Sequence, residues 1–450
     1  MLINTIFNKI NQIKSTGLFF VSPHPYSVGN NSEQLHFALM KAADEGKKVY
    51  ILFPFDIHFL FRRRLTNHAL FNIRSDLIYL QNPLLKFVSR LLVSLLIFPA
   101  RFYDLLIGIF GYSLSEFQVI PSVGTISIWL KKDHASEFSW ERLNEYQWSQ
   151  RTDQNFEFQF PLKDDKKANK SMLKLGISKV SWFVCLHVRE SGFRNDAGKR
   201  EYRNANIEKY IPAIKEITRL GGIVVRLGDK TMKPLPPMDN VIDYPFTDSK
   251  SDLMDIYLIK HCRFYISAPS GIYDTAALFG KKILMINNHM WVYGYPLQVH
   301  DRGILQHVYS LKKKRFLTLK ERISSDWNMQ NLWGDIDKDY ILFENSSDDI
   351  KNAVIEFIHN LDLNNFLMSK AQNIINSRRI DKGKNILDLK HLAPLGVLSD
   401  ELQIFAKYRL ASKFYSSKGS ISNSFVEKYW NEQYLPSDDD IKKLKTIRSS

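Results

Sequence analysis

The sequence predicts an α/β protein built from two doubly wound domains with parallel sheets. In both halves of the chain, short apolar segments rich in β-branched and aromatic residues alternate with segments of helical period. A chain of 450 residues is also too long for one ordinary core. We therefore expect residues 1–165 to form one domain, residues 171–375 a second, and residues 376–450 a helical tail that packs across both.

The first strand–helix–strand unit opens the chain. Residues 17–22 and 49–53 are expected to be strands, and residues 32–45 the helix between them. The loop before this helix contains Gly29 and Asn30, and a glycine there lets a ligand approach the backbone closely. A plain turn explains the spacing equally well.

The most apolar segment of the chain is 84–112. Lys86, Arg90 and Arg101 interrupt it and Pro99 breaks it, so no window of about 20 residues is suited to span a membrane. Two interpretations stay open: a helix that lies in a membrane interface, or a helix pair buried in the first domain. Residues 153–170 follow later, with short clusters of lysines and acids that predict a linker.

The second domain contains the clearest strand–helix–strand unit. Residues 180–188 predict a buried strand, Asn206 caps a helix over 207–220, and residues 223–227 predict the next strand. The remaining expected elements are strands at 241–244, 264–267 and 282–286 and helices at 251–259, 273–279, 347–361, 365–376, 400–412 and 422–434.

Polar side chains gather where these strands end, and parallel sheets bind ligands beyond the carboxyl ends of their strands. His187, Arg189 and Glu190 follow one strand, and Arg226 and Asp229 end the next. The loop between these strands is rich in basic residues. It is either part of a ligand site or a cluster of solvated charges. Free backbone N–H groups in the small-residue turn 268–272, ahead of a helix, predict an anion site.

Charge and cysteine content restrict the partners. The net charge of +15 indicates an anionic partner: acidic lipid, a phosphate-bearing substrate, or nucleic acid, which ranks last because no nucleic-acid motif accompanies the charge. Cys185 and Cys262 lie in apolar contexts, which excludes a disulfide framework and a cysteine zinc site. The first 20 residues lack the features of a signal peptide, so we expect a cytoplasmic protein.

Three motifs resemble fucosyltransferases. Residues 28–35 resemble the Gly-Asn-Gln-Leu loop of bacterial α-1,2-fucosyltransferases. His187-Val188-Arg189 resembles the His-x-Arg motif that those enzymes share with protein O-fucosyltransferases and the core α-1,6-fucosyltransferase of N-glycans. Residues 267–277 resemble a later turn and helix of the same enzymes. Residues 179–296 are more closely similar to an uncharacterised bacterial glycosyltransferase family found among surface-carbohydrate genes.

The resemblance implies a GT-B enzyme: two Rossmann-like domains, a nucleotide-sugar donor held by the second, and no essential metal or cofactor. Arg189 would contact the diphosphate of the donor, and a GDP-linked donor is favoured. The base of an inverting transfer would be Asp196 or, as a second choice, Glu190. Gly29 and Asn30 would face the acceptor. The further donor-binding candidates are His187, Arg194, Arg203, Arg226, Gly228, Asp229, Ser267, Pro269, Ser270, Gly271 and Asp274.

The implied activity is transfer of a hexosyl or deoxyhexosyl group to a glycan or lipid-linked acceptor of O-antigen or capsule, at the cytoplasmic face of the inner membrane. A non-catalytic GT-B protein of glycan assembly or binding is the main alternative. A nucleotide-sugar epimerase or dehydrogenase would need G-x-G-x-x-G after the first strand, where Gly29 stands alone. Asp335 and Asp337 have the spacing of a metal-binding pair but lie away from the expected ligand edge.

Overall fold

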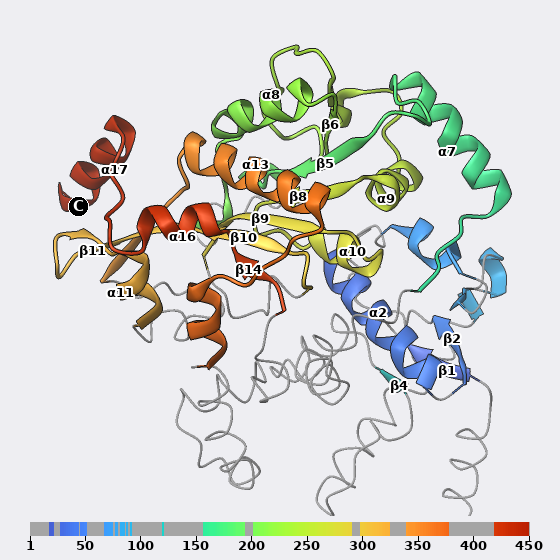
Figure 1. The fold of residues 1–450 in the computed structure, drawn as a ribbon. Coiled ribbons are helices and arrows are strands. Elements are labelled where there is room, and N and C mark those ends of the chain that lie inside the picture. Colours follow the sequence, from blue (N-terminus) through green and yellow to red (C-terminus); the bar gives the residue numbers. More distant parts are fainter. Residues whose placement is uncertain are drawn as a thin grey trace, which may run out of the picture. The chain divides into compact units, whose positions relative to one another are not determined.

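The structure of the chain is a computed structural model with two compact units (Figure 1). Unit 1 is Met1–Ser171 with Ser251–Tyr257 and Asp274–Gly280, and unit 2 is Met172–Lys250, Leu258–Tyr273 and Lys281–Ser450. Two short stretches from the middle of the chain thus belong with the N-terminal part. The structure describes residues 18–21, 28–44, 46–51, 67–74, 77–79, 82–85, 87–88, 91, 119–120, 156–193, 201–289, 298–324, 339–377 and 418–449.

Unit 1 contains a sheet whose paired strands are all parallel, in the order β3-β2-β1-β4. The predicted strand–helix–strand unit at the start of the chain is confirmed. Among the described residues, the elements of this part are β1 (Leu18–Val21), α2 (Val28–Asp44), β2 (Lys48–Ile51), the 3-10 helix η1 (His68–Asn72), β3 (Leu77–Ile78) and β4 (Val119–Ile120).

Helix α2 begins at Val28 and not at the expected residue 32, so Gly29 and Asn30 lie in its first turn and not in a loop. Ser32 is fully buried, and its Oγ lies 2.8 Å from Oγ1 of Thr275. This partner, far along the chain, helps to fix the first turn of the helix.

The segment expected to be a linker forms helix α7 (Leu162–Lys174). Its acids and lysines are placed as a helix favours them, with Asp164 and Asp165 in the first turn and Lys174 in the last. Asp165 Oδ1 also accepts a 2.9 Å hydrogen bond from the hydroxyl of Tyr257. The boundary between the two units falls at Ser171, within this helix, so the segment connects them as expected but is helical.

Unit 2 is organised around a larger sheet in the order β14-β10-β9-β8-β5-β6-β7, in which every neighbouring pair is parallel. Counted from β5, the strands run 3-2-1-4-5-6, which is a doubly wound Rossmann order. The predicted α/β class is therefore confirmed. The strands are β5 (Phe183–His187), β6 (Ile223–Arg226), β7 (Val241–Asp243), β8 (Phe264–Ser267), β9 (Ile283–Asn288), β10 (Arg302–Leu305) and β14 (Ser420–Ile421).

The predicted helix over 207–220 is present in two parts, the 3-10 turn η5 (Ile207–Tyr210) and α8 (Ile211–Arg219). Asn206 caps it, because its side chain accepts a hydrogen bond from N of Glu208. Pro212 has no N–H to donate, which favours a break at this point. Helix α8 packs against α13 (Ser347–Leu363), and both bury apolar side chains in the core of unit 2.

Other helices connect the strands of this part of the chain. They are α9 (Asp252–His261), α10 (Tyr273–Leu278) and α11 (Leu319–Ser324). Both cysteines are buried, as expected, and form no disulfide. No helix of the described part of the chain is long and apolar enough to cross a membrane.

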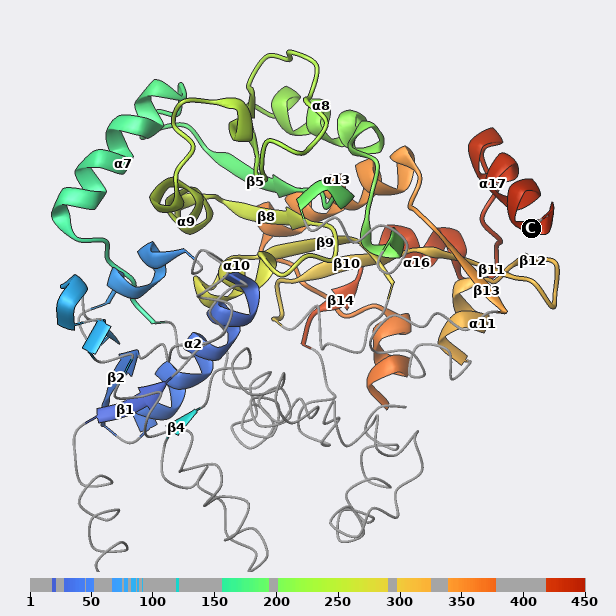
Figure 2. The ribbon, with the colours of Figure 1, turned by 180° about the vertical axis from the view of Figure 1, so that it is seen from behind.

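The described part of the tail, 418–449, belongs to unit 2. It was expected to be helical but begins with β14, which completes the large sheet, before α16 (Asn423–Tyr429) and α17 (Asp438–Ser449). In both views α17 lies beside a small antiparallel sheet of the order β12-β11-β13 (Figures 1 and 2). The small sheet consists of β11 (His307–Ser310), β12 (Arg315–Phe316) and β13 (Tyr340–Phe343).

Candidate functional site

The strand order of unit 2 reverses between β5 and β8, which are direct neighbours. His187 ends β5 and pairs in register with Ser267, which ends β8, and N of Ala268 donates a 3.0 Å hydrogen bond to O of His187. Connections leave these two strands in opposite directions, so a crevice opens at their carboxyl ends. The sequence candidates His187 and Ser267 therefore lie together at the point where such sheets bind nucleotides.

His187 is buried at this point, with only 8% of its surface exposed. Burial, followed by the positive charge of Arg226, lowers the pKa of His187 to about 4. Its Nδ1 atom has no hydrogen-bond partner. The ring is therefore neutral at neutral pH.

Arg189 lies two residues beyond the end of β5 and is half-buried. Its Nη1 donates a hydrogen bond to Oδ1 of Asn204, and its carbonyl accepts a 3.0 Å bond from N of Ala205. The residues that flank the basic loop are thus drawn together, and the guanidinium stays at the carboxyl edge of the sheet.

A short turn, η4 (Glu201–Arg203), is tied to two other strand ends. Nε of Arg203 donates a 3.0 Å hydrogen bond to O of Pro269, which follows β8. Nε2 of the buried Gln306, which follows β10, donates at 2.8 Å to O of Tyr202. The structure thus brings Arg203 and Pro269, two sequence candidates, into direct contact.

Arg226 and Glu190 belong to an ion-pair network. Arg226 is fully buried and donates to Oε1 of Glu190 at 2.7 Å, to Oδ1 of Asp243 at 3.1 Å and to O of Lys233 at 2.6 Å. Oε2 of Glu190 accepts from N of Lys233 at 2.8 Å. Both carboxylate oxygens of Glu190 are thus engaged, and the network connects the ends of β5, β6 and β7.

Gly228 and Asp229 form the turn that follows β6. Gly228 has φ +149°, and a Cβ there would lie 2.1 Å from Sδ of Met232, so only glycine fits. Oδ1 of Asp229 accepts hydrogen bonds from N and Oγ1 of Thr231 at 2.8 and 2.5 Å. The Asp229 side chain therefore caps this turn.

The other candidates are placed as follows. Ser270 and Gly271 lie in the turn between β8 and α10, where O of Ser270 accepts from N of Tyr273 at 3.3 Å. Asp274, like Gly29 and Asn30, belongs to unit 1. The residues that lie outside the described part of the chain are Arg194, Asp196, Asp335 and Asp337. In the described ranges no group of three or more His, Cys, Asp or Glu side chains could hold a metal ion.

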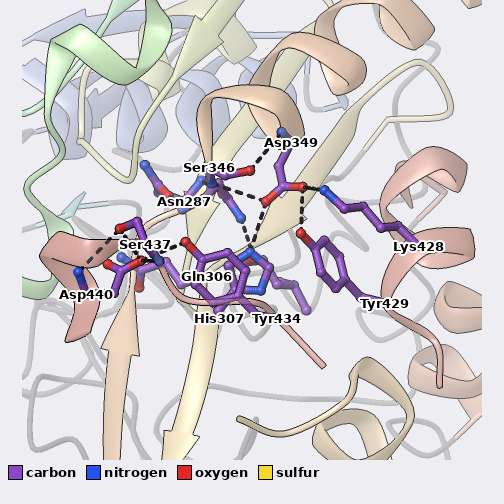
Figure 3. A network of polar contacts seen from close by, with 12 residues as sticks. Asn287, Gln306, His307, Ser346, Asp349, Lys428, Tyr429, Tyr434, Ser437 and Asp440 are labelled. Carbon is purple, nitrogen blue, oxygen red and sulfur yellow. Dashed lines mark hydrogen bonds and ion pairs between the residues drawn. The ribbon is translucent and has the colours of Figure 1, made fainter. Parts of the chain in front are cut away.

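A second polar network, none of whose members is a sequence candidate, joins the start of β11, the first turn of α13 and the C-terminal segment (Figure 3). Asp349, in the first turn of α13, accepts hydrogen bonds from His307 at 3.0 Å and from Lys428 and Tyr429 at 2.8 Å each. The ring of Tyr434 stacks on His307 at 3.8 Å. The C-terminal segment is therefore bound to the core of unit 2 by polar as well as apolar contacts.

The charges of this network are set by burial and by its hydrogen bonds. Burial alone would raise the pKa of Asp349, but the bonds from His307, Lys428 and Ser346 lower it overall. Burial also lowers the pKa of His307, against the attraction of Asp349. A sequence signal was available, since Ser346 and Asp349 form a capping box before an apolar segment.

Comparisons with known proteins give slight similarities only. No family model and no curated protein matches the chain. A structure of the dodecameric iron-containing heptosyltransferase TibC with ADP-D-beta-D-heptose is 19% identical over 26% of this chain and 29% of that one, with a TM-score of 0.19. TibC from enterotoxigenic E. coli H10407 is 17% identical over 24% and 28%, with a TM-score of 0.17. The match spans less than a third of TibC.

The structure of NodZ α-1,6-fucosyltransferase soaked with GDP-fucose covers more of the chain. It is 13% identical over 60% of this chain and 95% of that one, with a TM-score of 0.29. Similarities this slight do not bear on the activity of this chain, which rests on its own residues.

Proposed function

We propose that the chain is a glycosyltransferase of the GT-B type that holds a nucleotide-sugar donor at the β5–β8 crevice of unit 2. The observation that carries the proposal is the position of the His-x-Arg motif. His187 pairs with Ser267 where the strand order reverses, and Arg189 follows at the same sheet edge. A parallel sheet of Rossmann order in each unit is what a GT-B fold requires.

The chemistry assigned to this edge is stabilisation of a leaving diphosphate. Negative charge develops on the diphosphate as the glycosidic bond breaks, and a guanidinium fixed in advance can contact two of its oxygens. We assign this role to Arg189, with Arg203 as a second cation that contacts the turn after β8. Neutral His187 would offer the donor a hydrogen bond without adding charge.

The transfer would invert the configuration at the anomeric carbon and would need a base for the acceptor hydroxyl. Glu190 accepts hydrogen bonds from Arg226 and Lys233, so it would have to leave that network to take up a proton. This supports Asp196 as the base. We further propose a GDP-linked hexosyl or deoxyhexosyl donor, no metal requirement, and a glycan or lipid-linked acceptor of O-antigen or capsule.

The decisive experiment for catalysis is donor turnover by the purified full chain. Each member of a nucleotide-sugar panel is incubated with and without EDTA, and release of the nucleoside diphosphate is measured. The proposal requires release from at least one donor, unchanged by EDTA, and an Arg189→Ala variant that loses it. If donors bind but none is turned over, even with glycan and lipid-linked acceptors present, the protein is instead a non-catalytic glycan-binding or assembly protein.

We also propose that the chain binds the cytoplasmic face of the inner membrane through the apolar segment 84–112. Among the described residues of this segment, apolar side chains are exposed, with exposed fractions of 70% for Leu84, 53% for Leu85 and 43% for Leu91. Exposed apolar groups on a protein of net charge +15 suit an anionic membrane surface.

Co-sedimentation with anionic vesicles tests the membrane proposal. Binding should weaken with salt, and Lys86, Arg90 and Arg101→Glu should weaken it further. A matched variant with the same charge change elsewhere, Lys312, Lys314 and Lys442→Glu, should retain more binding. Equal losses in the two triple variants would show that only the total charge matters and that the segment 84–112 is not the anchor.

A further inference from the structure

The side chain of Arg189 is oriented by one residue of the segment that returns to it. Nη1 of Arg189 donates to Oδ1 of Asn204, and the main chain closes at the same place through the 3.0 Å bond from N of Ala205 to O of Arg189. The two bonds fix both the backbone and the guanidinium of Arg189 against residues 204–205.

The segment that carries Asn204 is itself fixed. O of Tyr202 accepts a 2.8 Å bond from Nε2 of Gln306, a residue of which only 2% is exposed, and Nε of Arg203 donates at 3.0 Å to O of Pro269. These contacts reach the ends of β10 and β8. The support of Arg189 is therefore anchored to strands other than the one that Arg189 follows.

The chemistry of the Asn204 side chain suits this task. An amide oxygen accepts a hydrogen bond from a guanidinium without adding a negative charge. A carboxylate at the same place would neutralise Arg189 and repel an anionic ligand. Ordering an arginine side chain costs rotamer entropy, and a partner that orders it before the ligand arrives reduces that cost on binding.

We infer that Asn204 is a positioning residue, which holds the guanidinium of Arg189 ready for the diphosphate of the donor. The inference rests on the proposed function, because it assigns Asn204 a part in the donor site proposed above. It also explains how a cation next to a basic loop keeps one orientation.

The test uses GDP and guanosine as probes of the full chain by calorimetry. Asn204→Leu keeps the size of the side chain but removes the acceptor. It should raise the Kd for GDP roughly tenfold, because the Arg189 side chain must then be ordered when the ligand binds, and leave the Kd for guanosine unchanged. In an Arg189→Ala background the same change should have no further effect on GDP.

Asn206→Leu is the matched control. Asn206 caps η5 two positions further on, so this variant disturbs the same stretch without touching Arg189. It should leave the Kd for GDP unchanged, and urea unfolding of all variants confirms that each is folded.

The outcomes separate this inference from the proposed function. If Arg189→Ala weakens GDP binding and Asn204→Leu does not, or if Asn204→Leu weakens guanosine equally, Asn204 has no positioning role. If Arg189→Ala leaves GDP binding unchanged, or the unaltered protein binds no GDP, the assignment of Arg189 to a GDP-donor diphosphate fails and the inference fails with it.

Discussion

Arg226 at the end of β6 donates a 2.7 Å hydrogen bond to Oε1 of Glu190, just beyond the end of β5. The guanidinium is fully buried, whereas the Glu190 side chain keeps 20% of its surface exposed. The sequence offered Glu190 as an alternative base and Arg226 as a donor-binding residue, and in the structure the two side chains bind each other. The pair connects neighbouring strand ends next to Arg189, so it supports the edge on which the proposed site depends.

Removal of Arg226 should therefore reduce stability. Arg226→Met leaves Glu190 and Asp243 without their cation in a half-buried place, and we expect a loss of about 3 kcal/mol in the free energy of unfolding, measured with urea. Arg219→Met is the control, because the Arg219 side chain, paired with Glu216 on α8, is 66% exposed and its ion pair should contribute less than about 1 kcal/mol. A loss in Arg226→Met no greater than in the control would contradict the structural role.

Substitution of Arg189 should affect catalysis and not stability. Arg189→Ala removes a charge-assisted contact to the leaving diphosphate, so kcat/KM should fall roughly 100- to 1000-fold while the urea midpoint stays close to that of the unaltered protein. Arg219→Ala removes an exposed arginine of the same unit and should keep full turnover. Turnover by Arg189→Ala at the normal rate would remove the central claim about the site.

The buried ring of His187 should make the protein less stable in mild acid. The pKa of His187 is about 4 in the folded state, below the ordinary 6.5. Between pH 4 and pH 6.5 the unfolded chain therefore binds a proton at this ring that the folded chain does not bind. The contribution of the neutral His187 ring to the free energy of unfolding is fully present above pH 6.5 and is lost as the pH falls toward 4. It should amount to about 2 kcal/mol between pH 7 and pH 5.

Urea unfolding at the two pH values measures this effect. The stability of His187→Gln should fall less than that of the unaltered protein by about 2 kcal/mol, whereas His359→Gln, at an exposed position on α13, should behave as the unaltered protein does. The same fall in all three proteins would mean that His187 can take up a proton without unfolding.

Asp349 should be essential for the attachment of the C-terminal segment. Asp349→Asn loses the charge that accepts bonds from His307, Lys428 and Tyr429, and we expect a loss of about 3 kcal/mol in the free energy of unfolding. The adjacent Asp348→Asn, at an exposed position of the same helical turn, should cost less than about 1 kcal/mol. Similar losses in the two variants would show that only the helix dipole is affected.

Several elements could be predicted closely because local signals agree. β8 was expected over 264–267 and is found at Phe264–Ser267, since an apolar segment ends at a small-residue turn. Helix α7 was missed because its charges were taken as a sign of a linker. Helix α2 begins at Val28, four residues before the expected start at Ser32, and Ser32 bonds to Thr275, a partner far along the chain that local signals do not reveal.

The site could be predicted to the level of the sheet edge and no further. Strand ends locate His187 and Ser267, because parallel strands meet at one edge. The sequence does not show which arginines form ion pairs within the protein. Arg226 and Arg189 both lie at or just beyond strand ends, but Arg226 pairs with the carboxylate of Glu190, whereas Arg189 donates to the amide oxygen of Asn204. Asn204 gave no signal, since its partner Arg189 lies 15 positions earlier in the chain.

The position of β14 has a consequence for how the chain is made. β10 ends at Leu305, but its parallel neighbour at the edge of the sheet, β14, begins only at Ser420. A ribosome that adds about 5–20 residues per second would need roughly 6 to 23 seconds to cover the 114 residues between them. During that time the edge of β10 has no strand to pair with, and an unpaired edge invites pairing between nascent chains. Slower translation over this interval should therefore lower the amount of protein recovered in folded form, and early binding of a chaperone should raise it.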